Sequence, residues 1–263
     1  MLFYFSGTGN SKLVAQRLAM LTQDFSYDME KYQAQPYMPV TTTSLGFVIP
    51  VYAWGLPLFV ETFFRKVLPS ILPALPDITY VYAVFTCGGN IGYADEELRK
   101  LLLSFAHLPL HAVWSVRMPN TYVCMPFYDA DYGKSAAKKL KETHSRLLGI
   151  ADAVIERKKE INVVRGLLPS FKTGPLRRLF NRKLVTDIYF YVCPDRCVSC
   201  GLCAKSCPCH NISMIPAEPY IVWKGEECTG CLRCFHYCPT NAIQFGPYTK
   251  NKHQYRAPQS FTE

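Results

Sequence analysis

Two runs of cysteines with identical spacing constrain this chain more than any other feature. Both follow the pattern C-x2-C-x2-C-x3-C-P, and the second repeats the first at an offset of 31 residues. The runs are Cys197, Cys200, Cys203 and Cys207 with Pro208, and Cys228, Cys231, Cys234 and Cys238 with Pro239. Three thiolates from one tight loop can hold three corners of a cuboidal 4Fe–4S cluster, while the fourth points toward a neighbouring cluster. The repeat therefore predicts two iron–sulfur clusters.

Two other kinds of cysteine chemistry fit the spacing less well. A zinc ribbon uses two pairs of cysteines about 15–20 residues apart, whereas each run here carries four cysteines and then a proline. A disulfide framework is typical of small secreted domains, and this chain has 263 residues. We therefore favour clusters over zinc and over disulfides.

The cysteine runs resemble the bacterial two-cluster ferredoxins. The resemblance implies that the fourth ligands cross over between the two runs. One 4Fe–4S cluster would be held by Cys197, Cys200, Cys203 and Cys238, and the other by Cys228, Cys231, Cys234 and Cys207. We expect this small α+β, ferredoxin-like module to occupy residues 188–248.

Length and composition indicate a second domain. A chain of 263 residues predicts about two domains, and 49% hydrophobic with 19% charged residues is enough to build a sizeable core. Residues 1–5 have no basic stretch, so we expect no signal peptide and a cytoplasmic location. Residues 33–60 carry no charge but contain four prolines, which favours loops around one buried strand over a membrane span.

The N-terminal segment predicts an anion site. Residues 2–5 form an apolar strand, residues 6–11 read Ser-Gly-Thr-Gly-Asn-Ser, and residues 12–21 have a helical apolar face. Glycine backbone, hydroxyls and a helix N-terminus together favour bound phosphate. The loop lacks both the Gly-Lys-Ser/Thr of a P-loop and the third glycine of the dinucleotide fingerprint. A mononucleotide phosphate is the favoured ligand, and an ordinary βα turn is the alternative.

The following residues alternate between strand and helix patterns, as in an α/β doubly wound parallel sheet. We expect strands at residues 25–31, 45–51, 80–85 and 112–117, and helices at residues 56–67, 93–105 and 132–159. Ligands of such sheets bind beyond the carboxyl ends of the strands. Aromatic residues and glycines converge there, at residues 50–55, 86–90 and 119–122, which suits a planar ring with polar edges.

Residues 1–160 resemble a flavodoxin, and the whole chain resembles the flavodoxin–ferredoxin fusion proteins of anaerobic bacteria and archaea. The matching motifs are SGTGNS, PVYAWGLP and TCGG, followed by the cysteine repeat. The resemblance implies bound FMN, with its phosphate held by Ser6, Thr8, Gly9, Asn10 and Ser11. The implied contacts of its ring are Tyr52, Ala53, Trp54, Gly55, Thr86, Cys87, Gly88, Gly89, Asn90 and Tyr122. Each aromatic residue also has a simpler interpretation as part of the core.

Residues 161–187 interrupt the alternating pattern and are basic. From residue 156 to residue 183 there are nine Lys or Arg against two Glu. A solvated linker is one interpretation, and a docking surface for an acidic redox partner is the other. No nucleic-acid-binding motif accompanies the charge. We expect the tail, residues 249–263, to wrap over the protein or to fray.

The remaining cysteines and two histidines have weaker signals. Cys193 and Cys209 flank the first cysteine run. They are interpreted as small buried residues, with alternative cluster ligands as the other possibility. No sequence pattern around Cys124 indicates a function. Cys87 lies in the expected flavin loop but has no identifiable base to activate it. We expect surface positions for His210 and His236.

Together these features predict an electron-transfer iron–sulfur flavoprotein. It would relay electrons between FMN and two 4Fe–4S clusters and on to redox partner proteins, with no catalytic acid, base or nucleophile. The alternative is an FMN-dependent reductase of a small molecule, such as a quinone, a nitro compound or a cofactor, fed by the clusters. The sequence also permits a homodimer in which the clusters of one protomer face the flavin of the other.

Overall fold

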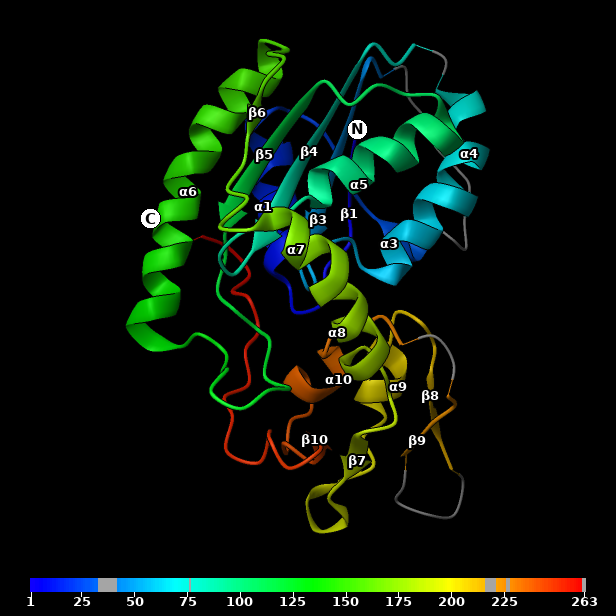
Figure 1. The fold of residues 1–263 in the computed structure, drawn as a ribbon, viewed down its shortest axis with the longest axis vertical. Helices are drawn as coiled ribbons and strands as arrows, with labels where there is room; N and C mark the ends of the chain where they lie inside the picture. The colour runs from blue at the N-terminus through cyan, green and yellow to red at the C-terminus, as the bar shows by residue number, and fades with distance from the viewer. Residues whose placement is uncertain (33–41, 76, 216–220, 226–227, 262–263) are drawn as a thin grey trace.

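The computed structural model describes residues 1–32, 42–75, 77–215, 221–225 and 228–261. Within these ranges, six strands form one parallel sheet in the order β2-β1-β3-β4-β5-β6 (Figure 1). The strands are β1 (Leu2–Tyr4), β2 (Ser26–Asp28), β3 (Ser44–Pro50), β4 (Tyr80–Cys87), β5 (Ala112–Arg117) and β6 (Ile161–Asn162). The order 2-1-3-4-5 is that of flavodoxin-like folds, so the predicted fold class is confirmed.

Helices cover both faces of this sheet (Figure 1). One face carries α1 (Asn10–Leu21) and α6 (Gly133–Ile155). The other carries α3 (Leu58–Thr62), η1 (Phe63–Val67), α4 (Leu68–Ile71), η2 (Leu72–Ala74), α5 (Ala94–Leu101) and η3 (Leu102–Ala106). The strands between these layers are consequently apolar on both sides, as expected for a buried parallel sheet.

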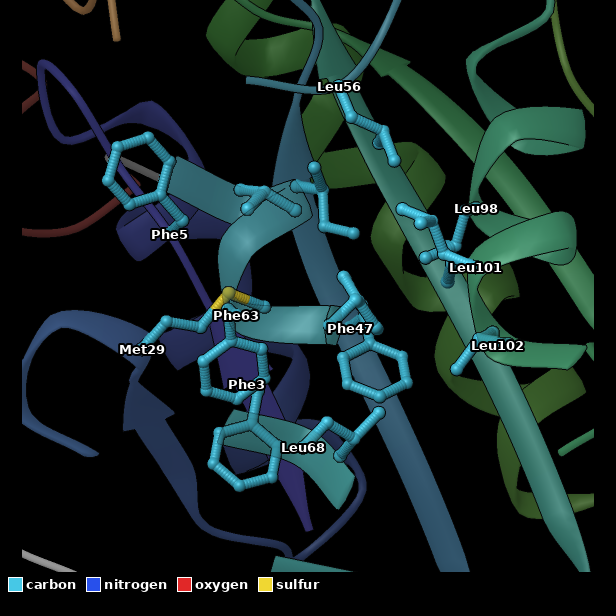
Figure 2. Packing of buried hydrophobic residues seen from close by; sticks show 14 of the residues in the cluster. Phe3, Phe5, Met29, Phe47, Leu56, Phe63, Leu68, Leu98, Leu101 and Leu102 are labelled. Atoms are coloured by element: carbon cyan, nitrogen blue, oxygen red, sulfur yellow. The ribbon is translucent and has the colours of Figure 1, made fainter. Parts of the chain in front are cut away.

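The N-terminal strand shows how the core is divided. Leu2 and Tyr4 face the α1–α6 layer, whereas Phe3 faces the opposite layer, because successive side chains of a strand alternate. Figure 2 shows Phe3, Phe47 and Phe63 gathered in that opposite layer. The Phe3 ring centroid lies 5.4 Å from that of Phe63 and 6.3 Å from that of Phe47. This packing fixes the strands whose carboxyl ends carry the predicted site.

Several predicted boundaries differ from the structure. The strand expected at residues 25–31 ends at Asp28, because α2 (Met29–Tyr32) begins there and buries Met29. The helix expected at residues 132–159 ends at Ile155. In the uncharged segment of residues 33–60, β3 confirms the expected buried strand, while residues 33–41 lie outside the described ranges. No helix within the described ranges is long and apolar enough to cross a membrane.

The C-terminal module reproduces the sequence repeat in its structure. Two antiparallel pairs form it, β7 (Phe190–Val192) with β10 (Ile243–Phe245), and β8 (Ile212–Met214) with β9 (Ile221–Trp223). Its helices are η5 (Pro194–Arg196), α9 (Leu202–Ser206) and α10 (Arg233–His236). Both α9 and α10, and likewise β8 and β10, begin 31 residues apart, which is the offset of the cysteine runs. Each cysteine run therefore encloses an equivalent helical turn and is followed by an equivalent strand.

Residues 161–187, expected to be an irregular linker, contain regular structure. β6 joins the edge of the large sheet, and a kinked helical segment follows in α7 (Pro169–Phe171), η4 (Lys172–Leu176) and α8 (Arg177–Leu184). Gly174 has non-helical dihedral angles and marks the kink. Figure 1 shows this segment leading from the end of the sheet to the cluster module.

Within its described residues, 249–261, the tail wraps back onto the N-terminal domain. The Ala257 N–H donates a hydrogen bond to the Thr8 carbonyl oxygen at 2.9 Å. The Tyr255 hydroxyl donates to Asn10 Oδ1 at 2.8 Å. The loop between β1 and α1 is thereby held by residues far away in the sequence.

Candidate functional site

A cavity of about 750 Å³ opens beyond the carboxyl ends of β1, β3, β4 and β5. This is where a doubly wound sheet binds its ligand. The predicted residues that line it are Ser6, Thr8, Asn10, Ser11, Tyr52, Ala53, Trp54, Thr86, Cys87, Gly88, Gly89, Asn90 and Tyr122. The three loops identified from the sequence therefore meet around one space.

Gly9 and Gly55, also predicted to bind the cofactor, do not line the cavity. Gly9 adopts a left-handed conformation with φ of 101°, and a Cβ there would lie 2.9 Å from the Ala257 Cβ. A Cβ on Gly55 would lie 2.0 Å from the guanidinium carbon of Arg177. Both glycines are explained by the close approach of another part of the chain.

The loop between β1 and α1, residues 6–11, is called the phosphate loop after the ligand that the sequence predicts, and it presents mainly backbone donors. The Ser6 hydroxyl accepts the Gly9 N–H at 3.1 Å, and the Ser11 and Thr86 hydroxyls share a buried hydrogen bond of 2.8 Å. The Asn10 side chain donates to the Pro119 carbonyl and accepts from Tyr255. The first N–H groups of α1 have no partner within the helix, so they remain for an anion. This arrangement fits the phosphate of FMN.

Two buried polar atoms at the cavity have no hydrogen-bond partner within the described ranges. They are Asn90 Oδ1 and the Tyr122 hydroxyl. Burial raises the pKa of Tyr122, so that hydroxyl stays protonated and can donate. A buried polar group without a partner is costly, which makes these two atoms suited to the polar edge of a flavin. Gly89 also lines the cavity, and a Cβ at this position would meet no atom within 4 Å.

Tyr52 and Trp54 supply aromatic surface on the loop after β3. Trp54 has a φ of 60°, its carbonyl accepts the Thr173 hydroxyl at 3.0 Å, and Lys172 Nζ lies 5.9 Å from its ring centroid. Burial and the nearby Cys231 raise the pKa of Tyr52 well above its ordinary value. The loop thus reaches both the helical segment and the cluster module.

The helix α8 forms a wall of the cavity that the sequence reasoning missed. Leu176, the last residue of η4, and Phe180 and Leu184 of α8 follow one another at helical spacing, and all three line the cavity. The Phe180 ring centroid lies 5.3 Å from that of Tyr122. The apolar spacing of four residues was a visible signal, but the surrounding glycines, prolines and charges concealed it.

Arg177 anchors α8 to the N-terminal domain. Its buried guanidinium contacts Glu97, lies 3.4 Å from Glu61 and donates to the Leu56 carbonyl at 2.7 Å. Burial raises the pKa of Glu97, and the positive charge of Arg177 opposes that shift. One of the basic residues expected to serve a partner is therefore paired inside the protein.

The eight repeat cysteines surround two small hollows. One is lined by Cys197, Cys200, Cys203 and Cys238, and the other by Cys207, Cys228, Cys231 and Cys234. These sets are the crossed-over ligand sets that the spacing predicts, so the residues present fit two 4Fe–4S clusters. Across the described ranges, no three His, Cys, Asp or Glu side chains gather as ligands of a single metal ion.

The environments of the cluster cysteines differ. Burial raises the pKa of Cys203 to about 11 and that of Cys228 to about 12. The pKa of Cys238 is lowered instead. Burial alone would raise it, but hydrogen bonds from backbone N–H groups, including that of Ala242 at 3.1 Å from the sulfur, outweigh the effect of burial. Binding to iron deprotonates thiols, so the metal would supply the positive charge that the buried sites lack.

One cysteine belongs to both the cavity and the second hollow. Cys231 lines each of them, together with Thr229 and Leu232. A Cβ on Gly7 would lie 2.9 Å from the Cys231 carbonyl oxygen, so the phosphate loop and the second cysteine loop are in direct contact. The first hollow does not share this wall, and its Cys200 is exposed.

Arg233 joins the two domains at this contact. Its guanidinium donates to the carbonyls of Ser6 and Gly7, the latter at 2.9 Å, and to the Ser206 carbonyl at 2.7 Å. It also forms an ion pair with Glu30, with one hydrogen bond of 2.8 Å. Since these groups are largely buried, the arginine fixes the cysteine loop against the phosphate loop.

The two histidines and two of the cysteines with weaker sequence signals lie in different surroundings. His210 is exposed as expected, but the surface position expected for His236 is wrong. The buried His236 accepts the Tyr255 N–H at Nδ1 and donates from Nε2 to the Thr121 carbonyl at 2.8 Å, and burial lowers its pKa to about 4. Burial raises the pKa of Cys87 to about 11, which makes it a poor nucleophile. Cys209 lines the second hollow.

Comparison with known proteins identifies the C-terminal module. Residues 196–242 match the family model of the 4Fe-4S dicluster domain. The ferredoxin of Methanothermococcus thermolithotrophicus is 35% identical over 51 residues, which cover 19% of this chain and 83% of that ferredoxin. The putative electron transport protein YccM of Escherichia coli (strain K12) is 44% identical over 45 residues, 17% of this chain and 12% of that protein.

Solved structures align with the N-terminal part. The Trp repressor binding protein from Bacillus subtilis is 14% identical, with a TM-score of 0.41, over 60% of this chain and 99% of that one. The flavodoxin-like fold of this chain is shown by its own strand order, 2-1-3-4-5.

Proposed function

Because the chain belongs through its C-terminal module to the 4Fe–4S dicluster ferredoxins, and carries a flavodoxin-like domain before it, we propose that it is an electron-transfer flavoprotein. It relays electrons between FMN in the large cavity and the two clusters, and on to redox partner proteins. FMN, when bound, exchanges one or two electrons, whereas a 4Fe–4S cluster carries one. Fusion in one chain makes the exchange intramolecular.

The position of Cys231 carries this proposal. It lines both the cavity and the second hollow, so that no other layer of protein separates the two sites at this point. Cys207 and Cys238 link the two cysteine runs by crossing over between the hollows. The proposed order is flavin cavity, second cluster, first cluster, and the exposed Cys200 marks where a partner exchanges electrons.

The roles of the chain's own residues follow from their positions. The N–H groups at the start of α1 bind the phosphate, and the unpartnered atoms of Asn90 and Tyr122 bond the ring edge. The inner face of α8 shields the cavity from water.

An anaerobic redox titration tests the proposal. Purified protein is followed by EPR and visible absorption, and iron, sulfide and FMN are quantified on the same sample. The relay requires about eight irons and one FMN per chain, with clusters and flavin in reversible exchange. Protein without flavin, or with two irons or fewer and bound zinc, would contradict it.

A reductase of small molecules is the second candidate. The cavity continues to a rim formed by Met125, Phe127 and Tyr128, where Phe127 is fully exposed and has a φ of 65°. Such an aromatic rim suits a planar acceptor, such as a quinone or a nitroaromatic compound. Stopped-flow mixing of reduced protein with menadione or nitrofurazone distinguishes the two. Rapid one-way oxidation by these compounds, with slow exchange between clusters and protein partners, favours the reductase.

A further inference from the structure

Four large apolar side chains stand out from the surface of the segment between the sheet and the cluster module. The exposed fractions are 83% for Leu167, 71% for Leu168, 54% for Phe171 and 57% for Leu179. A single exposed leucine is ordinary, but a close group of large apolar side chains marks a contact surface.

This segment is anchored, so the exposure is not that of a frayed loop. The Tyr93 N–H donates to the Thr173 hydroxyl at 2.9 Å, and Arg177 is buried among acidic partners. Phe180 and its neighbours on the inner face of α8 line the cavity, while Leu179 is exposed beside them. The apolar side chains are therefore exposed along an anchored segment: Leu167 and Leu168 lie in the bend before α7, Phe171 ends α7, and Leu179 lies on α8.

The charged side chains that this segment itself contributes are all basic. Residues 161–186 contain six basic residues and no Asp or Glu. Arg165 and Arg177 are paired with carboxylates of α3 and α5. Arg178, Arg182 and Lys183 are exposed, and within the described ranges they form no ion pair with the rest of the chain. These three cations thus lie on α8 within about one helical turn of the exposed Leu179, in the same segment as the other apolar side chains.

We propose that residues 167–183 form a peripheral docking surface for an anionic lipid bilayer. Leu167, Leu168 and Phe171 would enter the boundary between headgroups and acyl chains. Arg178, Arg182 and Lys183 would face the lipid phosphates. Basic residues beside exposed Leu and Phe on a helix are the features that bind a membrane surface without spanning it. The surface is independent of the electron relay.

Two other occupants fit less well. A second copy of the chain across a twofold axis would bring Arg178, Arg182 and Lys183 near the same cations of its partner. An acidic protein would meet three leucines and one phenylalanine, whereas the strongest contacts between proteins are enriched in Trp, Tyr and Arg and poor in Leu. An anionic bilayer uses both the charge and the aliphatic side chains.

Vesicle flotation with the full, cofactor-loaded chain tests the surface. Vesicles of phosphatidylcholine alone are compared with vesicles of phosphatidylcholine and phosphatidylglycerol at 7:3. We expect binding to the anionic vesicles, weakened in 0.5 M salt. Leu167→Ser/Leu168→Ser lowers the affinity at least tenfold, because less apolar surface is buried. Arg178→Gln/Arg182→Gln lowers it about thirtyfold, since each cation near the membrane contributes roughly one factor of five.

A matched control comes from α6, where Leu148 and Lys138 are also exposed. Leu148→Ser/Lys138→Gln should bind vesicles as the wild type does, and iron content and circular dichroism confirm that every variant is folded. The proposal is overturned if wild-type protein stays unbound with anionic vesicles at low salt, or if the α6 control loses binding equally. Dimerisation in sedimentation that Leu167→Ser/Leu168→Ser abolishes, without vesicle binding, would assign the surface to a second copy.

Discussion

Arg233 offers the sharpest test of how the two domains are joined. Replacing it with Met removes the donor to the Ser6, Gly7 and Ser206 carbonyls and leaves Glu30 without its partner. The two side chains are 11% and 21% exposed, so solvent screens their interaction only partly. Breaking a buried pair of this kind costs about 3–5 kcal/mol. For a chain of this size, 3 kcal/mol corresponds to a fall in Tm of roughly 6–12 °C.

Anaerobic differential scanning calorimetry measures the effect, on samples matched for iron and sulfide. Arg182→Met, at an exposed arginine of α8, is the control and should leave the Tm within about 1 °C. The double variant Glu30→Gln/Arg233→Met should lose less stability than the sum of the losses in the two single variants, because each single change already breaks the same ion pair. If Arg233→Met melts within 2 °C of wild type, the contact does not hold the domains together and the reasoning is refuted.

Three further predictions concern the cavity and the clusters. Gly55→Ala should lower the free energy of unfolding by about 2 kcal/mol or more, because the new Cβ would displace Arg177. Gly149→Ala on α6 is the control, since its Cβ meets nothing within 4 Å, and in the same calorimetry it should stabilise the protein by up to about 1 kcal/mol. Tyr122→Phe should weaken FMN binding about tenfold in a fluorescence titration. The flavin-free variant should be at least as stable as the flavin-free wild type, because an unpartnered buried hydroxyl is removed. An unchanged affinity for FMN would count against the contact with the ring. Cys200→Ser and Cys231→Ser should each reduce the iron content from about eight to about four per chain. Only Cys231→Ser should also shift the flavin absorption, because Cys231 lines the cavity and Cys200 does not. Identical flavin spectra of the two variants would contradict the proposed order of sites.

The sequence predicted the features that depend on local pattern. The cysteine spacing led to the two sets of four cysteines that surround the two hollows, and the strand–loop–helix motif led to Ser6, Thr8 and Ser11, which line the large cavity. Alternating strands and helices were sufficient for the fold class, although β2 was predicted too long because α2 follows it directly.

Features that depend on distant contacts were not predictable in this way. Gly9 and Gly55 looked like ligand contacts, yet each makes room for a residue more than 100 positions away. Arg177 looked like a surface charge, but carboxylates of α3 and α5 bury it. Around α8, the charges and glycines concealed the four-residue apolar spacing of the face that lines the cavity. Single-residue properties do not reveal which partner a side chain meets.

The contact between the tail and the phosphate loop has a consequence for biosynthesis. Tyr255 and Asn10 are separated by 245 residues, yet the hydroxyl of one holds the amide of the other. At about 5–20 residues per second, a ribosome needs roughly 12–50 s to advance from the loop to residues 255–257. The anion loop emerges among the first residues but reaches its final form only after Ala257 has left the exit tunnel. Uptake of the proposed flavin would therefore report that residue 257 has left the ribosome, and a chain terminated before residue 255 would lack the contacts that hold this loop.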